Sequence, residues 1–327
     1  MRKLYLAFLL LCLQGFGYAQ SALLDVALIE PSVKANGMAN AFTANNQDVF
    51  GFYYNPAQSS DTVQIGATYQ KGYMEDNTGV IAAKIPTKVI DMGVSLYYYN
   101  TGDLDSGAQG ATDMMVLLNL SRKIFGPLSL GVNGKYLHSS LFGDLTASTM
   151  MYDAGALLEF KYFNMGASVA NINGSLNYGV EDEEIPTVTR VGILLHSDKD
   201  SVIGVAAGVD YVKVSSEAFI RAGGEVSFSN MVAGRGGYEY GDKGNNGFSM
   251  GIGLLLGQLQ LDYAFTVYNQ LKENVHKIGL IYKFESAKAS YEKQQPAQRK
   301  NVTGNNNRYP QQQQQNRYRS AGGPYRY

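Results

Sequence analysis

Apolar and polar residues alternate along short segments through most of the chain. Between residues 62 and 70 the odd positions are Val63, Ile65, Ala67 and Tyr69, and polar residues or glycine occupy the even positions. Strict alternation over this length predicts a β-strand with one apolar face and one polar face. The same pattern predicts fourteen strands, at residues 62–70, 78–85, 89–99, 112–122, 128–137, 148–160, 162–170, 187–195, 201–211, 217–227, 231–240, 247–256, 258–268 and 276–284.

The segments that join these strands alternate between short turns and longer loops. Residues 85–87 and 125–127 are short, whereas 100–111, 138–147 and 171–186 are long. A soluble β-sandwich also alternates apolar and polar positions, but it has no reason to sort its loops by length. Transmembrane barrels have short turns on one rim and long loops on the other. We therefore predict an all-β fold: a fourteen-stranded antiparallel transmembrane β-barrel over residues 62–284, in contact with outer-membrane lipid, with both termini in the periplasm.

The first nineteen residues have the organisation of a secretory signal peptide. Arg2 and Lys3 precede an apolar run from Leu4 to Leu13, and small residues at 17 and 19 mark a cleavage site after Ala19. The apolar run is too short to span a membrane. The single cysteine, Cys12, lies inside it. Residues 1–19 are therefore predicted to be removed, which leaves a mature chain without disulfides or thiolate metal sites.

A segment that does not alternate, residues 20–61, comes before the first predicted strand. Small residues dominate positions 35–41, and Asn55-Pro56 is a turn signal. The segment can fold back into the barrel as a plug, or it can be a plain periplasmic extension. If it is a plug, Asn36, Gly37, Asn55 and Pro56 are the candidates for contact with the lumen.

The polar faces of the predicted strands carry charges of both signs. They are Lys135, Asp153, Glu159, Arg190, Asp210, Arg221, Glu225, Arg235, Glu239 and Asp262. In a barrel these side chains point into the lumen. They can pair across the interior and make it rigid, or they can line a charged permeation path. Arg190, Arg221, Glu225 and Arg235 are the candidate lumen residues in this set.

Residues 285–327 differ in composition from the rest of the chain. They hold 8 Lys and Arg against 2 Asp and Glu, whereas residues 20–284 hold 17 against 26. A tail rich in Gln, Asn, Arg and Tyr cannot bury a core and is predicted to be disordered. Behind a signal peptide we expect no nucleic-acid partner. The tail is either inert or a contact for an anionic envelope polymer or a partner protein.

No motif for catalysis, a cofactor or a metal stands out. His138, His196 and His276 fall in separate loops or strand ends, and residues 103–107 resemble a calcium loop only faintly because the ordered oxygen ligands are missing. The acidic run Glu181–Glu184 is either a solvated loop or a site for an ion or partner. We predict a protein that is not an enzyme, with no catalytic residues, cofactor or metal, although a hydrolase built on two carboxylates stays open.

Several stretches resemble the PorV/PorQ-like outer-membrane proteins, which are similar to the FadL hydrocarbon transporters. Near the N-terminus these are Ala35–Phe42 and Tyr53–Ala57. Further stretches follow in the order of the family, at Tyr98–Asp103, Leu130–Tyr136, Val169–Ile172, Ile185–Pro186, Leu261–Phe265 and His276–Gly279. Asn40 and Gln58 depart from the family, which prefers Gly there, and the basic tail is an addition.

The resemblance implies a fourteen-strand barrel with an N-terminal hatch. PorV-like members work with the type IX secretion system and bind secreted cargo, whereas FadL-type relatives pass hydrophobic small molecules through a lateral gap. We therefore expect a role in type IX secretion, with secreted cargo or secretion components as partners. The alternative is transport of a hydrophobic ligand, and a structural or adhesin-like barrel is a third possibility.

Overall fold

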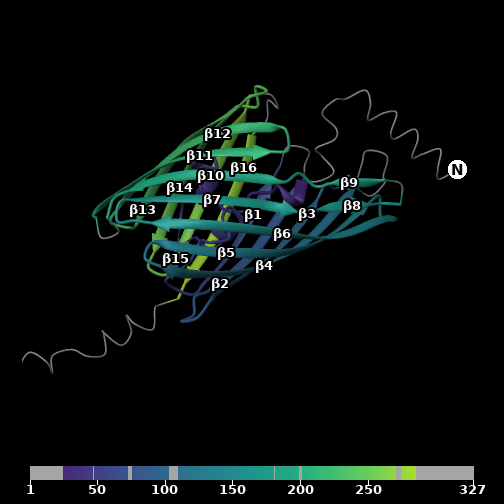
Figure 1. Ribbon diagram of the computed structural model, residues 1–327. Coiled ribbons are helices and arrows are strands. Elements are labelled where there is room, and N and C mark those ends of the chain that lie inside the picture. Colours follow the sequence, from purple (N-terminus) through teal and green to yellow (C-terminus); the bar gives the residue numbers. More distant parts are fainter. Residues whose placement is uncertain are drawn as a thin grey trace, which may run out of the picture. The chain divides into compact units, whose positions relative to one another are not determined.

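The computed structural model describes residues 25–46, 48–72, 76–102, 110–179, 181–198, 201–269 and 274–284. The predicted signal peptide, the stretch 103–107 and the tail at 285–327 lie outside these residues. Fourteen strands close into one barrel with antiparallel neighbours throughout (Figure 1). Their bounds are β1 Gln64–Lys71, β2 Asn77–Ile85, β3 Asp91–Asn100, β4 Ala111–Phe125, β5 Leu128–Leu141, β6 Leu145–Glu159, β7 Phe163–Ile172, β10 Val188–His196, β11 Ile203–Val214, β12 Glu217–Phe228, β13 Val232–Gly241, β14 Gly247–Leu256, β15 Leu259–Tyr268 and β16 Asn274–Lys283.

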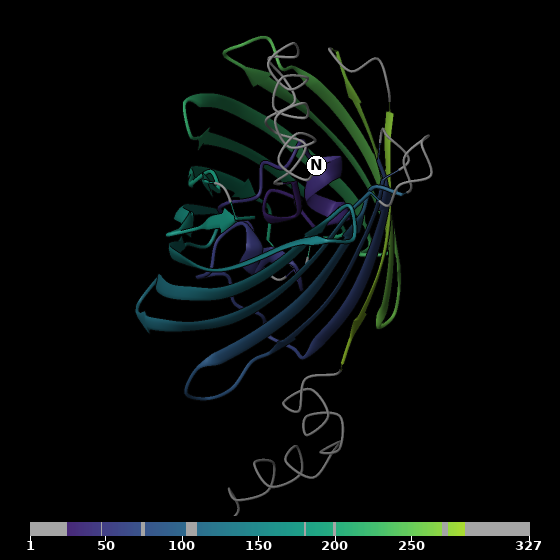
Figure 2. The ribbon, with the colours of Figure 1, turned by 90° about the vertical axis from the view of Figure 1, so that its right-hand side faces the viewer.

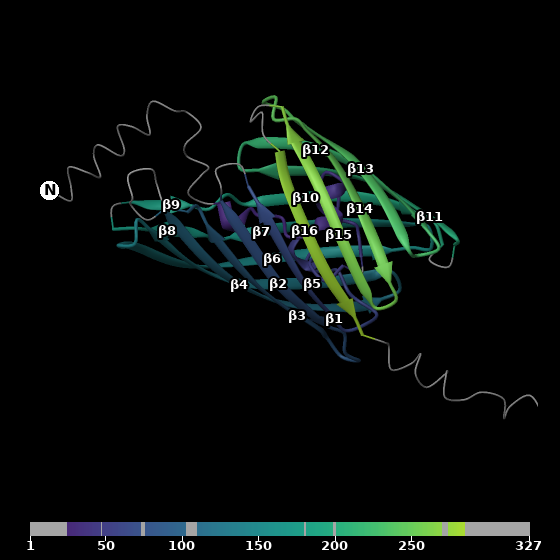
Figure 3. The same cartoon turned by 180° about the vertical axis from the view of Figure 1, so that it is seen from behind.

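The barrel confirms the predicted number of strands, and each predicted segment forms one of them. The seam closes where β1 pairs with β16, with Ile65 opposite Tyr282, and Figure 3 views these strands from behind. β7 pairs directly with β10. The two remaining strands, β8 Ser175–Asn177 and β9 Asp182–Glu184, form a separate hairpin in the connection between β7 and β10.

The outer face of the barrel is apolar. Ile81, Leu118 and Ile193 are among the large apolar side chains that stay exposed there. Exposed aromatic residues gather toward both ends of the strands, at Tyr69, Tyr98, Tyr136, Tyr211 and Tyr240 toward one end and at Phe125, Phe160, Tyr162, Phe228 and Phe284 toward the other. An apolar band between two aromatic girdles is the surface that a transmembrane barrel presents to lipid.

The two longest connections of the barrel, residues 101–110 and 173–187, lie at the same rim, although that rim also has short turns at 142–144 and 215–216. The rim formed by residues 86–90, 126–127, 160–162, 197–202, 229–231 and 257–258 is called the turn rim, and the opposite rim the loop rim. The prediction of a long loop at 138–147 is wrong, because β5 continues to Leu141 and β6 begins at Leu145. Phe142 and Gly143 both have positive φ, 55° and 76°. Two such residues are enough for a tight hairpin turn, so alternation continues where a loop was expected.

The segment before β1 lies inside the barrel, as the purple ribbon in Figure 2 shows. The described residues of 25–61 are called the hatch. They contain three short helices, η1 Asp25–Ala27, α2 Val33–Gly37 and η2 Gly51–Tyr53. Among the described residues, no helix has the length and apolar character that a membrane crossing needs.

Candidate functional site

The hatch is held in shape by its own polar contacts. Ser32 caps α2, because its hydroxyl accepts from the backbone N–H of Ala35 at 3.1 Å. The same hydroxyl donates to Asp48 at 3.0 Å, and the other oxygen of Asp48 accepts from the backbone N–H of Phe50 at 2.8 Å. Burial raises the pKa of Asp48. These bonds join the first and second halves of the hatch.

Large apolar side chains of the hatch are buried inside the barrel. Phe42, Phe52, Tyr53 and Tyr54 are each no more than 2% exposed. Burial of a side chain of this size contributes about 1.5–3 kcal/mol. The hatch is therefore packed like a protein core, and it occupies the lumen instead of leaving an open channel at this level.

Polar side chains of the wall bind the backbone of the hatch. Lys84 of β2 donates to the carbonyl of Gln58 at 2.8 Å, and Asn119 of β4 donates to the carbonyl of Pro56 at 2.9 Å. In the same way, the side chains of Asn133, Asn164 and Ser168 donate to the backbone carbonyls of Phe52, Ala44 and Tyr54 respectively. Buried carbonyl groups need such partners, so the wall strands provide what secondary structure provides elsewhere.

Asp210 of β11 binds a turn of the hatch. One of its oxygens accepts from the backbone N–H groups of Phe42 and Thr43 at 2.7 and 2.8 Å, and from the Thr43 hydroxyl at 2.7 Å. Asp210 is only 2% exposed. A buried carboxylate with three donors forms strong, charge-assisted hydrogen bonds. This residue therefore fixes the position of the hatch against β11.

A ring of lumen-facing glycines lets the hatch approach the wall. A Cβ atom on Gly131 would lie 2.1 Å from the carbonyl oxygen of Pro56, and one on Gly223 would lie 2.2 Å from the carbonyl oxygen of Met38. Eleven different strands each contribute one such glycine: Gly66, Gly93, Gly131, Gly155, Gly166, Gly192, Gly208, Gly223, Gly237, Gly251 and Gly279. Glycine is the residue that permits close backbone approach. The inner wall is thus shaped to the hatch around most of its circumference.

Two chains of ion pairs connect the hatch to the wall. In the first, Lys34 of α2 lies 2.9 Å from Glu225, which lies 2.6 Å from Arg235. Arg235 also lies 2.6 Å from Asp262. Positive and negative groups alternate along this chain, so each buried charge has a partner of opposite sign.

Glu30 of the hatch begins the second chain. Its carboxylate lies 2.5 Å from Arg221 and 3.6 Å from Arg190, and Arg221 lies 2.6 Å from Glu239. The ammonium group of Lys277 on β16 donates to the carbonyl of Glu30 at 2.5 Å. Glu30 therefore contacts β10, β12 and β16 at once.

All eight candidate residues from the sequence lie where the hatch meets the wall. Asn36 accepts from the hydroxyl of Thr266 at 3.1 Å, and Gly37 packs against Gly251. Asn55 donates to the carbonyl of Ala156 at 2.9 Å. Pro56, Arg190, Arg221, Glu225 and Arg235 make the contacts given above. No group of three or more His, Cys, Asp or Glu side chains with metal-site geometry occurs in the described part of the chain.

An apolar cluster fills the lumen between the hatch and the loop rim on the side of β3 to β6. The β8–β9 hairpin contributes to it, because Leu176 and Ile185 are 1% and 3% exposed and pack with Met115, Leu137 and Met151. The hydroxyl of Tyr178 donates to Ser139 of β5 at 2.7 Å. We call this cluster, with the hairpin that covers it, the rim cluster.

The wall is uneven beside the rim cluster. The last pair between β6 and β7 joins Tyr152 to Ile172, and the part of β6 from Leu145 to Met151 extends beyond it. The pairing of β6 with β7 shifts register between Tyr152 and Ala154. Beside this shift the consecutive residues Ala170 and Asn171 of β7 are both buried, so both side chains face inward. The hairpin packs beside the extended part of β6, since the backbone N–H of Ser175 donates to the Thr149 hydroxyl at 3.3 Å. The hairpin therefore covers an edge that β7 does not reach.

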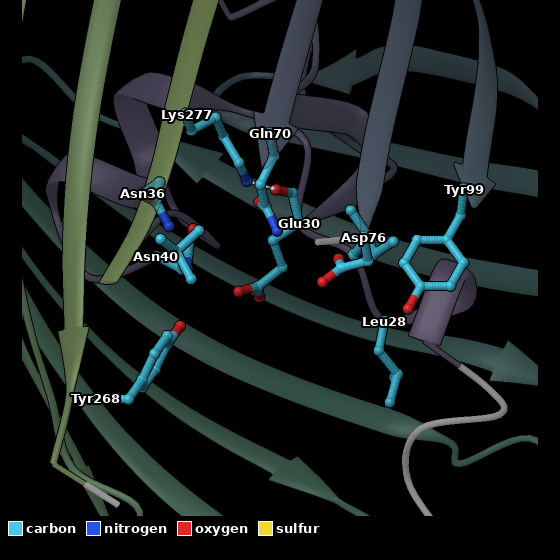
Figure 4. Close-up of a pocket in the computed structure, with 11 residues that line it drawn as sticks. Leu28, Glu30, Asn36, Asn40, Gln70, Asp76, Tyr99, Tyr268 and Lys277 are labelled. Atoms are coloured by element: carbon cyan, nitrogen blue, oxygen red, sulfur yellow. Dashed lines mark hydrogen bonds between the residues drawn. The ribbon is translucent and has the colours of Figure 1, made fainter. Parts of the chain in front are cut away.

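A cavity of about 340 Å³ opens at the loop rim between the hatch and the wall (Figure 4). The hatch and the ends of β1, β3, β15 and β16 line it with the residues Leu28, Ile29, Glu30, Asn36, Asn40, Gln70, Asp76, Tyr99, Tyr268, Val275 and Lys277. Its lining mixes charged, amide, aromatic and aliphatic groups, so the cavity suits a ligand with both a polar and an apolar part.

No family model and no curated protein sequence matches the chain. Solved structures with the same architecture do match. The toluene transporter TodX of Pseudomonas putida is similar over 78% of this chain and 98% of that chain, with a TM-score of 0.55 and 11% identity. A FadL homologue of Pseudomonas aeruginosa is similar over 78% and 98%, with a TM-score of 0.53 and 12% identity. The chain has the FadL-type barrel fold. The narrower resemblance to PorV/PorQ proteins stays a prediction.

Sequence reasoning missed two parts of this site. It did not identify that glycines at lumen positions of successive strands, such as Gly131 and Gly155, form one ring. That signal was present as a glycine in the polar half of the alternation. It also missed the β8–β9 hairpin, because strands of three residues, Ser175–Asn177 and Asp182–Glu184, are too short to carry a pattern.

Proposed function

We propose that the protein is an outer-membrane barrel that takes up small hydrophobic or amphiphilic molecules at its loop rim, with the hatch closing the lumen behind them. The loop rim faces outward and both termini face the periplasm. The apolar outer face and the two aromatic girdles support insertion in a membrane. The protein acts by binding and passage, without catalysis.

The observation that carries this proposal is the rim cluster. Leu176 and Ile185 of a short hairpin occupy an apolar space walled by Met115, Leu137 and Met151. A hairpin with few residues and only short strands is among the least stable elements of a fold. When it moves away, the same apolar walls can bind a hydrophobic molecule. Methionine side chains adapt well to varied ligands because they are flexible and polarisable.

The fold supports the same function by analogy. Solved structures of this architecture include a toluene transporter and a monoaromatic hydrocarbon channel. The hatch and its ion pairs prevent free passage of ions and solutes, so uptake has to be selective.

A reversible crosslink tests the proposal. A Cβ atom on Gly174 would lie 2.8 Å from Cγ of Met151, so cysteines at positions 174 and 151 are close enough for a disulfide. In cells that express Gly174→Cys with Met151→Cys, we expect oxidation to reduce the uptake rate of radiolabelled toluene at least about tenfold, and a reductant to restore it. Equal uptake in the oxidised and reduced states would refute the role of the hairpin.

The control pair is Gly174→Cys with Ile185→Cys. These positions are also adjacent, since the built Cβ atom of residue 174 lies 3.0 Å from Cβ of Ile185. Their disulfide stays within the connection between β7 and β10 and leaves the contact with β6 uncrosslinked. Uptake should then be independent of the redox state.

A second candidate is the type IX secretion role that the sequence resemblance implies. The extended part of β6 supports it, because once the β8–β9 hairpin moves away, this edge of β6 is a surface to which another protein can add a strand. Native mass spectrometry of the gently extracted protein separates the two candidates. A co-purifying protein with a sorting domain supports secretion, and a retained hydrophobic molecule without protein supports transport.

A further inference from the structure

The wall of the rim cluster has a polar pair directly above an apolar pair. Asp113 of β4 lies opposite Ser139 of β5 in the register, and the next inward-facing pair, farther from the loop rim, is Met115 with Leu137. All four side chains are buried. The space that the β8–β9 hairpin covers therefore has an apolar floor and a polar group at its loop-rim end.

Asp113 is a buried carboxylate with few partners. It is 3% exposed, and Ser139 is the only described residue whose side chain donates a hydrogen bond to it. None of the salt bridges among the described residues includes Asp113. By comparison, one oxygen of Asp210 accepts three hydrogen bonds. A buried charge is costly when it is poorly paired, so Asp113 strongly favours a hydroxyl donor at position 139.

This arrangement decides what Ser139 can bind. A serine hydroxyl has one hydrogen to donate and two lone pairs that accept. The hydrogen of Ser139 is given to Asp113, so its oxygen can only accept, and hydrogen bonds in such a chain strengthen one another. The polar group at the end of the apolar space therefore selects a partner that carries a hydrogen-bond donor.

The hairpin already supplies such a partner. Tyr178 lies in the turn between β8 and β9, and its hydroxyl donates to the oxygen of Ser139 at 2.7 Å. Its ring packs against the buried apolar side chains of the rim cluster. The chain thus places a phenol, with its hydroxyl and its ring, in the space that opens when the hairpin moves away.

We propose that the preferred ligand of the rim cluster is a small phenol, whose hydroxyl replaces that of Tyr178 as the donor to Ser139. Its ring lies against Met115 and Leu137. The inference rests on the proposed function, because the space becomes accessible only when the hairpin moves. It adds a substrate class, since a site built around a hydrogen bond discriminates strongly against analogues that lack the donor.

Three probes of similar shape test the need for a donor. In p-xylene a methyl group replaces the hydroxyl of p-cresol, and 4-methylanisole keeps the oxygen but has no hydrogen to donate. Isothermal titration calorimetry on the full chain, extracted from membranes in a non-ionic maltoside detergent, would compare them after correction for the measured partition of each probe into micelles. We expect p-cresol to bind at least about tenfold more tightly than either analogue. Equal binding of p-cresol and p-xylene would overturn this inference alone, whereas no binding of any probe would overturn the proposed function with it.

Substitution of Ser139 tests the location. Ser139→Ala should weaken p-cresol at least about tenfold without weakening p-xylene. The matched control is Ser148→Ala, because Ser148 is an exposed serine of β6 whose hydroxyl bonds His138 at 2.9 Å, and this variant should bind p-cresol as the native protein does. An equal loss of p-cresol and p-xylene binding in Ser139→Ala would show a structural role only and refute the site.

Substitution of Tyr178 tests the displacement. Tyr178→Phe keeps the ring but removes the hydroxyl that competes for Ser139, so p-cresol should bind about threefold or more tightly than to the native protein. Unchanged or weaker binding would show that Tyr178 does not compete with the ligand. Because the three-probe comparison uses native protein, it decides the donor requirement even if a variant folds poorly.

Discussion

Gly131 of β5 and Pro56 of the hatch approach so closely that a Cβ atom on Gly131 would stand 2.1 Å from the Pro56 carbonyl oxygen. The positions of a Cβ atom and of a carbonyl oxygen are both fixed by the backbone, so neither atom can move away by rotation of a side chain. Gly131→Ala should therefore displace the hatch locally and destabilise its docking by about 1–3 kcal/mol, as overpacking does in cores. Hydrogen exchange of the amides in residues 48–58 measures this as a loss of protection.

Gly134 provides the matched control. It lies on the same strand but faces outward, and a Cβ atom there would meet nothing within 4 Å. Gly134→Ala should leave the exchange of the hatch unchanged. If both alanine variants exchange alike, the close approach of hatch and wall has no energetic consequence.

The ion pairs of Glu225 make a second prediction. Glu225→Gln removes the counter-charge of Lys34 and one of the two counter-charges of Arg235. Removing one partner of a buried pair typically costs roughly 3–5 kcal/mol, and here Arg235 retains Asp262, so we expect the lower part of that range. The readout is the free energy of hatch opening from hydrogen exchange in α2.

An exposed pair tests whether burial is the cause. Lys243 and Glu217 lie 3.0 Å apart, with side chains 54% and 35% exposed. Glu217→Gln should change stability by less than about 1 kcal/mol. A loss as large as that of Glu225→Gln would contradict the explanation by burial.

The hydrogen bonds of Asp210 predict that its substitution by alanine and by asparagine will destabilise the hatch to different extents. Asp210→Ala leaves the backbone N–H groups of Phe42 and Thr43 without their acceptor, and each buried unpaired group costs about 1–3 kcal/mol. Asp210→Asn keeps a carbonyl acceptor and should cost less. Exchange of the amides of residues 42 and 43 should therefore be fastest in the alanine variant. The reverse order would show that the carboxylate does not hold this turn.

The pH dependence of docking should include a contribution from Asp48. Burial raises its pKa above the ordinary value of 3.8, although the Phe50 N–H bond opposes this. The protonated form is thus favoured in the docked hatch, and its stabilising contribution is complete below pH 3.8 and lost as the pH rises through the raised pKa. The difference in opening free energy between the native protein and Asp48→Asn should change in this direction. A difference that does not vary with pH would exclude Asp48 as a titrating group.

The strands could be predicted because each carries its own signal. Alternation in a stretch such as Gln64–Lys71 depends only on which face meets lipid, and every wall strand has the same two environments. Residues 138–147 were wrongly predicted to form a long loop. The alternation continues there through serine residues, which a strand tolerates at the rim of the barrel. The β8–β9 hairpin depends on contacts with β5 and β6, which no local pattern encodes.

The candidate site could be predicted only in part. The mixed charges at Arg221, Glu225 and Arg235 pointed to a lumen because a lipid-facing charge is costly. Their partners Glu30 and Lys34 could not be identified, since a partner almost two hundred positions away in the sequence leaves no trace in local composition. The same holds for Asp210, whose partners are backbone groups present in every residue.

The glycine ring links two events that are otherwise separate, the docking of the hatch and the closing of the seam. Glycines on both sides of the seam, Gly66 on β1 and Gly279 on β16, contact the hatch at Phe50 and Val33. The hatch thus touches both strands that must meet to complete the barrel. We therefore expect assembly to be cooperative, because a variant that loosens the hatch also removes contacts that hold β1 and β16 together. In that case the N-terminal segment would serve as an internal template for the wall that surrounds it.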